Sequence, residues 1–441
     1  MARIGMRLET KSNMERRAPL TPDDVRELLM IQGLEIVVQP SPYRVFKDEE
    51  YSAVGATLSD DINDCDFILG IKEIGIPYLH ESKPHLFFSH VIKGQLYNMA
   101  MLREILAKKV TVIDYEKVTN DKGMRIIAFS YQAGRAGMVN NLWSMGQRFK
   151  AWGIDNPLQD LRQASTYEGG LAEAKAAIME SGKLIRENGV SDEIGPLVIG
   201  ITGGPGRVSL GAQDVLSAIE PESLTPGDLL DPEKRSALRN DRVYQVVFDM
   251  PDFLRRTDGK PYSFQDYLDH PEAYEAYLTE YLPYLSAVVN GIYWEERFPR
   301  LITIQNLRDL FASDVRPKLA VLSDVTCDVG GSIESTIVAT LPDKPVYVYN
   351  LDSDEIVYGF TAPGMQMMTV DILPTEIPRE SSEQFGMMLK PFLYALAKAD
   401  YSVPFEELQI PDEFKRAVIT HHGEFTPDYE YIRKFLNADR V

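Results

Sequence analysis

Short apolar runs alternate with amphipathic segments along the first third of the chain, and this pattern predicts a parallel sheet covered by helices. Helix signals separate the runs. Thr21 is a suitable N-cap, Pro22 suits the first helical position, and acidic residues follow in the first turn. The strands expected in this part of the chain are 3–7, 33–39, 67–71, 86–88 and 110–114.

The alternation resumes near residue 190, after two long helical segments at about 134–153 and 168–188. An apolar run at 196–202 is followed by a glycine-rich turn and then by another helical segment. Glycine permits positive φ and close backbone approach, and a helix N-terminus offers N–H groups to a pyrophosphate. Strand, turn and helix in this order predict a dinucleotide-binding site formed by Gly203, Gly204, Gly206, Arg207 and Val208.

We expect an α/β protein of two Rossmann-like domains with parallel sheets and an inter-domain cleft. Residues 1–150, completed by about 360–441, would bind the substrate. Residues 190–355 would form the dinucleotide-binding domain, with further strands near 318–323 and 345–349. This domain would carry a helical insertion at about 250–310, in which the tyrosine-rich segment 262–284 forms a packed amphipathic face.

Polar residues follow several expected strands, at the edge where open α/β sheets bind ligands. Lys72 and His90 each follow an apolar run, and both residue types act as acids and bases. Arg17 lies between a strand and a helix, where a guanidinium can hold a carboxylate through two hydrogen bonds. Asp324 and Asp328 follow the strand near 318–323. The alternative for these residues is a surface lysine, a satisfied histidine, a solvated arginine and capping aspartates.

Composition narrows the classes of partner. The chain of 441 residues has a formal net charge of −20, which argues against nucleic-acid binding. Its sequence has no apolar run long enough for a membrane span and no secretory leader. The two cysteines, Cys65 and Cys327, make no disulfide framework, and no metal-ligand cluster stands out in the sequence. We therefore expect a cytoplasmic protein without a metal, nucleic-acid or membrane partner.

Several unusual blocks resemble, in the same order, the lysine–2-oxoglutarate reductase family, the lysine-forming saccharopine dehydrogenases. That family belongs to the alanine dehydrogenase and transhydrogenase superfamily. The resemblance implies that L-lysine and 2-oxoglutarate are joined and that the imine is reduced with NAD(P)H to saccharopine. The matching blocks are 7–22, 69–73, 87–90, 113–117, 290–295, 324–334 and 373–385.

The resemblance also implies roles for single residues. Lys72 and His90 match the acid/base pair of the family, and Arg17 matches an arginine that binds a substrate carboxylate. The glycine turn matches the cofactor loop. Further matches are Glu73, Glu116 and Arg125, which would line the substrate cleft, and Asp324 and Asp328, on the nicotinamide side.

Two departures from the family pattern concern the cofactor and the partners. The turn at 202–207 is one residue longer than in the two-headed lysine-degrading enzyme. The sequence also has no second catalytic half, so a separate glutamate-forming saccharopine dehydrogenase would complete the pathway, and a homodimer stays open. The strand expected to end near 223–225 has no acid at its tip, while Arg207, Arg235 and Arg239 lie near it in sequence, which favours NADP(H) over NAD(H).

Three alternatives share parts of this pattern. An alanine dehydrogenase-like enzyme that uses ammonia would keep Arg17, Lys72, His90 and the glycine turn, but it would not need the additional cleft acids. An opine-type enzyme would use an amine other than lysine. A non-catalytic nucleotide- or metabolite-binding protein would have no chemical need for the lysine, the histidine and the arginine together.

Overall fold

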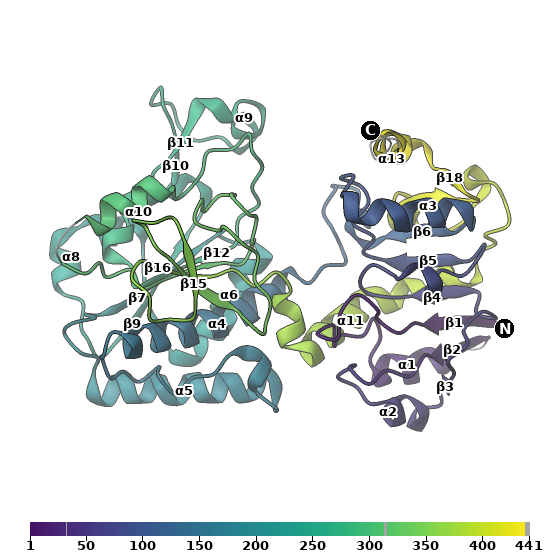
Figure 1. Cartoon of the computed structure of the whole chain (residues 1–441), viewed down its shortest axis with the longest axis horizontal. Coiled ribbons are helices and arrows are strands. Elements are labelled where there is room, and N and C mark those ends of the chain that lie inside the picture. The colour runs from purple at the N-terminus through teal and green to yellow at the C-terminus, as the bar shows by residue number, and fades with distance from the viewer. Residues whose placement is uncertain (32, 313–314, 437–441) are drawn as a thin grey trace. The chain divides into compact units, whose positions relative to one another are not determined.

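The structure is a computed structural model that describes residues 1–31, 33–312 and 315–436. Contacts divide the chain into two units. Met1–Phe129 and Pro378–Val441 form the first unit, and Ser130–Ile377 forms the second. Each unit has its own mixed, mostly parallel sheet with helices packed on it (Figure 1). The α/β class expected from the sequence is confirmed.

The sheet of the first unit has the strand order β18-β17-β6-β5-β4-β1-β2-β3. Strands β1 to β6 run parallel to one another. At one edge of the sheet, β17 is antiparallel to β6, and β18 is antiparallel to β17. The strands are β1 (Ala2–Met6), β2 (Leu34–Val38), β3 (Thr57–Leu58), β4 (Phe67–Leu69), β5 (Pro84–Phe87), β6 (Thr111–Asp114), β17 (Val418–His421) and β18 (Glu424–Phe425).

The core of the first unit joins both ends of the chain. The long helix α11 (Pro378–Lys398) packs Phe385 and Leu389 into the same apolar cluster as Val25 of α1. Thr21 caps α1, as the sequence predicts, through a hydrogen bond from the backbone N–H of Asp24. The helices include α1 (Pro22–Leu29), α2 (Asp48–Ala53), α3 (Met99–Ala107), α12 (Asp412–Lys415) and α13 (Arg433–Leu436).

The sheet of the second unit has the order β15-β14-β16-β13-β12-β7-β9-β8. Six neighbouring strands run parallel to one another: β8, β9, β7, β12, β13 and β16. At the far edge, β14 is antiparallel to β16, and β15 is antiparallel to β14. The strands are β7 (Leu197–Thr202), β8 (Glu222–Leu224), β9 (Val243–Phe248), β12 (Ala287–Asn290), β13 (Val321–Asp324), β14 (Val346–Tyr349), β15 (Ile356–Tyr358) and β16 (Met365–Met368).

Two glycines place α4 (Ser130–Ala151) in the second unit. A Cβ on Gly134 would collide with the carbonyl of Val208 in α6 (Arg207–Leu216), and a Cβ on Gly211 would collide with the carbonyl of Tyr131. The two helices therefore pack backbone against backbone. This packing assigns residues 130–150 to the second unit rather than to the substrate-binding part expected from the sequence. Residues 360–377 also belong to the second unit, because β16 lies in its sheet.

The expected helical insertion at 250–310 differs from what the structure shows. The segment contains the ribbon of β10 (Leu254–Arg256) and β11 (Tyr274–Ala276), short 3₁₀ turns, sheet strand β12, and the helices α9 (Phe264–Asp269) and α10 (Ile304–Phe311). Prolines at 251, 261, 271 and 283 prevent a long helix. The tyrosines do pack as expected, since Tyr267, Tyr274 and Tyr281 are buried in one apolar cluster.

The strand beside β7 is a second correction. The sequence pattern made residues near 223–225 the second strand of the dinucleotide-binding fold. In the sheet, β8 instead lies at the edge, and β9 pairs with β7 over its whole length, from Leu197↔Val243 to Thr202↔Phe248. Helices α7 (Pro226–Leu230) and α8 (Pro232–Ser236) connect β8 to β9, while α5 (Gly170–Asn188) precedes β7.

Two further properties concern the described part of the chain. None of its helices is long and apolar enough to cross a membrane. The same residues contain no group of three or more His, Cys, Asp or Glu side chains that could hold a metal ion.

Candidate functional site

The carboxyl ends of β4 and β5 bring the segments with Lys72 and His90 together. These strands are parallel neighbours, and beyond them the backbone N–H of Phe88 still donates to the carbonyl of Ile71 at 2.8 Å. His90 has φ +49°, a left-handed conformation that is uncommon outside glycine. The sheet therefore fixes the histidine by a constrained turn at the edge where ligands bind.

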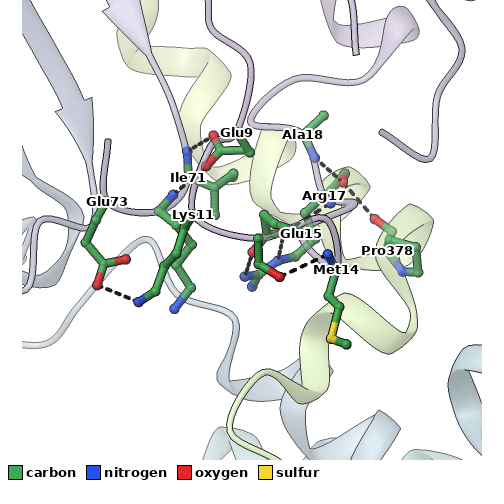
Figure 2. A network of polar contacts seen from close by, with 12 residues as sticks. Glu9, Lys11, Met14, Glu15, Arg17, Ala18, Ile71, Glu73 and Pro378 are labelled. Atoms are coloured by element: carbon green, nitrogen blue, oxygen red, sulfur yellow. Dashed lines mark hydrogen bonds and ion pairs between the residues drawn. The ribbon is translucent and has the colours of Figure 1, made fainter. Parts of the chain in front are cut away.

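A buried glutamate fixes the backbone at Lys72. Glu9 accepts a hydrogen bond from the N–H group of Ile71 at 2.7 Å (Figure 2). It accepts another from the N–H group of Lys72 at 2.9 Å. Burial raises the pKa of Glu9, and Arg7, 3.5 Å away, opposes that shift. The Arg7 guanidinium also donates to the carbonyl oxygen of Lys72. The backbone N–H and the carbonyl of Lys72 are thus both held by charged side chains. Neither Glu9 nor Arg7 was predicted from the sequence as a site residue.

The Glu73 carboxylate contacts two basic side chains of the first unit, those of His90 and Lys11. Its Oε1 accepts a hydrogen bond from Nζ of Lys11 at 2.6 Å (Figure 2). The same oxygen lies 2.8 Å from Nδ1 of His90. The side chain is only 8% exposed, and its Oε2 is buried without a hydrogen-bond partner among the described residues. Burial would raise the pKa of Glu73, but the bonds and charges from His90 and Lys11 outweigh it and hold that pKa well below its usual range.

The protonation of Glu73 determines the tautomer of His90. An ionised carboxylate only accepts hydrogen bonds, so Nδ1 of His90 must carry the proton in their contact. The other ring nitrogen, Nε2, is then the one that gains and releases a proton. Lys11 was not predicted from the sequence, because the loop that carries it has no periodicity that marks a site.

Arg17 is more enclosed than a substrate-binding arginine was expected to be. Its Nε donates to Oε1 of Glu15 at 2.8 Å, its second amino group donates to Oε2 at 2.5 Å, and both side chains are 3% exposed (Figure 2). The guanidinium carbon also lies 4.2 Å from the centre of the Phe129 ring. A guanidinium has five N–H groups, and the pair with Glu15 uses the edge formed by Nε and one amino group.

Glu116 and Arg125 form a looser pair nearby in the fold. Their side chains lie 3.3 Å apart, and Arg125 is about half exposed. Asp114, at the end of β6, accepts hydrogen bonds from the backbone N–H groups of Ser89 at 3.1 Å and Glu116 at 2.8 Å. Burial and the neighbouring Glu116 charge raise the pKa of Asp114 to about 6. Asp114 thus positions residues on both sides of the site, a role that its place at a strand end could have indicated.

The second unit contains the predicted glycine turn between β7 and α6. Gly203 and Gly204 have φ values of +100° and +46°, and both N–H groups donate to the carbonyl of Phe248, at 3.1 and 2.9 Å. Gly206 is the N-cap of α6, so the N–H groups of Arg207 and Val208 begin the helix. A Cβ on Gly204 would collide with the Asp249 carboxylate, so the turn requires glycine at this position. The N–H groups at the start of α6 are what suit a dinucleotide pyrophosphate.

The predicted nicotinamide-side acids have different surroundings. Asp324 is fully buried, and its carboxylate accepts hydrogen bonds from Asn290 at 2.9 Å, Thr326 at 2.6 Å and Thr336 at 2.7 Å. Burial raises its pKa. Asn290 in turn accepts from Thr202 at 2.8 Å, so one network joins the tips of β7, β12 and β13. Asp324 therefore positions the strand ends instead of facing a ligand, whereas Asp328 is exposed.

Comparisons with known proteins agree with the sequence blocks. Residues 5–136 match the family described as alanine dehydrogenase/PNT, N-terminal domain. The chain is 38% identical to alpha-aminoadipic semialdehyde synthase of Arabidopsis thaliana, over 99% of this chain and 42% of that protein. It is 36% identical to the mitochondrial alpha-aminoadipic semialdehyde synthase of Mus musculus, over 99% of this chain and 48% of that protein. The chain thus spans a little under half the length of these relatives.

A fungal relative and two solved structures match over nearly their whole length. Saccharopine dehydrogenase [NAD(+), L-lysine-forming] of Emericella nidulans is 26% identical over 95% of this chain and 98% of that protein. The structure resembles L-alanine dehydrogenase, with a TM-score of 0.63, 15% identity and coverage of 98% and 99%. It also resembles a transhydrogenase from Sinorhizobium meliloti, with a TM-score of 0.57, 15% identity and coverage of 96% and 100%.

The structural likeness gives the fold, and the sequence matches give the relationship that the motifs indicated. Residues 5–136 match the alanine dehydrogenase/PNT N-terminal domain family, and the chain is similar in sequence to the lysine-forming saccharopine dehydrogenases and to part of the alpha-aminoadipic semialdehyde synthases.

Proposed function

We propose that this chain is a nicotinamide-dependent oxidoreductase that joins L-lysine to 2-oxoglutarate, reduces the imine to saccharopine, and also catalyses the reverse, lysine-forming reaction. The contact between Glu73 and His90 carries the proposal, because it sets an oriented proton carrier at the ligand-binding edge of the first sheet. The names of the fungal relatives, which include lysine formation and NAD(+), support the substrate and the class of cofactor.

The reaction begins when the uncharged ε-amine of lysine attacks the keto carbon of 2-oxoglutarate. Nε2 of His90 accepts the proton that the amine loses, and it returns a proton to the hydroxyl as water leaves the carbinolamine. Loss of water leaves a protonated imine, whose carbon accepts the hydride that a bound reduced nicotinamide would supply, and the product is a neutral secondary amine. Lys72 acts as the second acid/base group and polarises the keto oxygen.

Charged residues of the first unit account for substrate binding. The unpartnered Oε2 of Glu73 suits an ammonium donor of the amino-acid substrate, because a buried acceptor without a partner is costly. The exposed Arg125 suits one carboxylate of 2-oxoglutarate, and the amino group of Arg17 that the pair with Glu15 does not use would hold the other. Glu116 holds Arg125 in place.

The second unit supplies the cofactor site in this proposal. Gly203, Gly204, Gly206, Arg207 and Val208 hold the dinucleotide, with the pyrophosphate at the start of α6. Asp324 acts through Asn290, and Asp328 lies on the nicotinamide side. A cytoplasmic location, a homodimer and a separate chain for the glutamate-forming step stay predictions.

The test is oxidation of reduced nicotinamide by the purified chain with 2-oxoglutarate and lysine, ammonia or no added amine. We expect oxidation that depends on lysine. Oxidation with ammonia alone would make the chain an alanine dehydrogenase-like enzyme. Cofactor binding without oxidation under any of these conditions would favour the non-catalytic alternative.

A further inference from the structure

A hollow of about 450 Å³ lies in the second unit, where the end of α4 meets the segments that lead into β13 and β16. This volume is within the usual range of small-molecule sites. Because β7, β12, β13 and β16 are parallel, the starts of β13 and β16 lie at the sheet edge opposite to the glycine turn. The hollow is therefore separate from the predicted dinucleotide site. Its lining residues are Arg148, Trp152, Phe311, Arg316, Pro317 and 361–364.

The charge of this hollow is positive, although the chain as a whole is acidic. The formal net charge of the chain is −20, yet none of the described residues that line the hollow is acidic and two are arginines. Two hollows of the first unit each contain three carboxylates, from Asp60, Asp61 and Glu81 in one and from Asp23, Glu50 and Glu383 in the other. An anionic ligand needs such a local basic site, because the remaining charge of the protein repels it.

Arg148 is buried without a carboxylate partner in the part of the chain that the structure describes. Only 2% of the residue is exposed, and its amino groups donate to the carbonyls of Phe360, Ala362 at 2.8 Å and Gly364 at 2.7 Å. Burial and the nearby Arg316 charge lower the pKa of Arg148 to about 10, so the group stays charged at neutral pH. An anion in the hollow would offset a buried charge that otherwise has only carbonyl dipoles around it.

Arg316 provides an accessible cation, and Trp152 provides a flat surface beside it. The guanidinium carbon of Arg316 lies 4.5 Å from the centre of the Trp152 ring, and that of Arg148 lies 5.2 Å from it. The Arg316 side chain is 37% exposed, and its partner Glu193, 3.5 Å away, is 69% exposed. An ion pair this open to water contributes little, so the donors of Arg316 can turn to a ligand at small cost.

From these contacts we infer that the hollow binds a small anion built on a flat ring. A carboxylate or phosphate group of the ligand pairs with Arg316, and its ring lies against Trp152 and Phe311. Both kinds of group accept two N–H donors from one guanidinium. Arg148 adds its charge to the field that attracts the ligand. The inference does not depend on the proposed function, because no step of that reaction uses this edge of the sheet.

The test is calorimetric titration of the full chain with phenyl phosphate and, separately, with benzoate, with benzyl alcohol as the uncharged control. We expect at least one of the two anions to bind and the alcohol not to bind. Tighter binding of one anion identifies the charged group that the hollow selects. Binding should persist in the presence of NADH, because the two sites lie at opposite edges of the sheet. Loss of anion binding on addition of NADH would overturn the inference.

Arg316→Gln removes the charge from the hollow at an exposed position and should weaken anion binding about tenfold or more. Arg255→Gln is the matched control. Arg255 is also exposed in the second unit and lies 4.9 Å from the ring centre of Tyr277, but it pairs with Glu275 and Glu280. The control should bind the anions as the wild type does. Absence of binding of both anions to the wild type, or equal affinities of the wild type and Arg316→Gln, would overturn the inference, while lysine-dependent turnover tests the proposed function separately.

Discussion

Nδ1 of His90 lies 2.8 Å from Oε1 of Glu73, and this contact assigns the exchangeable proton of the ring to Nε2. The same oxygen of Glu73 accepts a hydrogen bond from Lys11 at 2.6 Å. The glutamate therefore stays ionised, and it keeps the imidazole in one orientation at the end of β5.

Replacement of His90 removes the proposed proton carrier. We expect His90→Gln to lower kcat for lysine-dependent reduction by about a hundredfold or more, within the range of general acid–base catalysis. His270→Gln is the matched control, because His270 is exposed in the second unit and lies outside the proposed site. Steady-state kinetics on both variants measure the effect. Turnover of His90→Gln within a few-fold of the wild type would refute the assignment.

Alanine at position 204 should destabilise the protein through both backbone strain and a collision with Asp249, and Gly195 separates these two causes. Both Gly204 and Gly195 have positive φ, +46° and +59°, but a Cβ on Gly195 would meet nothing within 4 Å. We expect Gly195→Ala to cost about 1 kcal/mol of unfolding free energy through backbone strain alone. Gly204→Ala should cost more, about 2–4 kcal/mol, because its Cβ also displaces Asp249.

Denaturant titration of the two glycine variants gives the stability difference, and NADH titration gives the functional one. Only Gly204→Ala should weaken NADH binding. Equal losses of stability and affinity in both variants would show that the contact with Asp249 has no role.

The buried pair of Arg17 and Glu15 should matter more for stability than an exposed pair of the same kind. Glu15→Gln leaves the guanidinium buried without its charge partner, and we expect a loss of about 3 kcal/mol. The control is Asp23→Asn, which breaks the exposed pair with Arg26 in the same unit and should cost less than about 1 kcal/mol. Urea unfolding compares them, and similar losses in the two variants would contradict the prediction.

How far the sequence predicts this molecule depends on the range of the interactions involved. The strand ends before Lys72 and His90 followed from local apolar runs, and so did the glycine turn. Lys11 and Glu9 were missed, because their roles depend on contacts with residues more than sixty positions away along the chain. Local composition carries no signal for such a pairing.

The order of the strands in the second sheet was the other feature that the sequence did not predict. The chain passes through β8 before β9, but β9 is the strand that pairs with β7. Spacing therefore directed attention to residues near 223–225 and away from the end of β9. In the segment 262–284 the tyrosine spacing favoured a helix, and the prolines that interrupt it were the more informative signal.

Stability should fall with rising pH because of one buried carboxyl. Glu376 accepts hydrogen bonds from Asn140 at 3.0 Å, Gln163 at 3.1 Å and Ser165 at 3.3 Å, and burial raises its pKa to about 7. The folded state keeps this proton between the unfolded pKa of about 4.3 and about 7, while the unfolded state has lost it. The unfolding free energy therefore decreases across that window, by about 4 kcal/mol for this group, and the cost stays constant above it.

Urea titrations at several pH values between these limits test this prediction. The wild type should lose stability as pH rises, and Glu376→Gln, which cannot ionise, should lose less. Parallel pH profiles for the two proteins would mean that Glu376 does not cause the dependence.

The bond formed in the proposed reaction joins the two substrates through the ε-nitrogen of lysine, and the product itself reports this bond. The measurement is mass spectrometry of the reaction of the full chain with 2-oxoglutarate, reduced nicotinamide and lysine that carries a heavy isotope at its ε-nitrogen. We predict a single product that contains both carbon skeletons joined through the labelled nitrogen. Formation of glutamate with the lysine skeleton released, or of no product that retains the label, would contradict the proposed function.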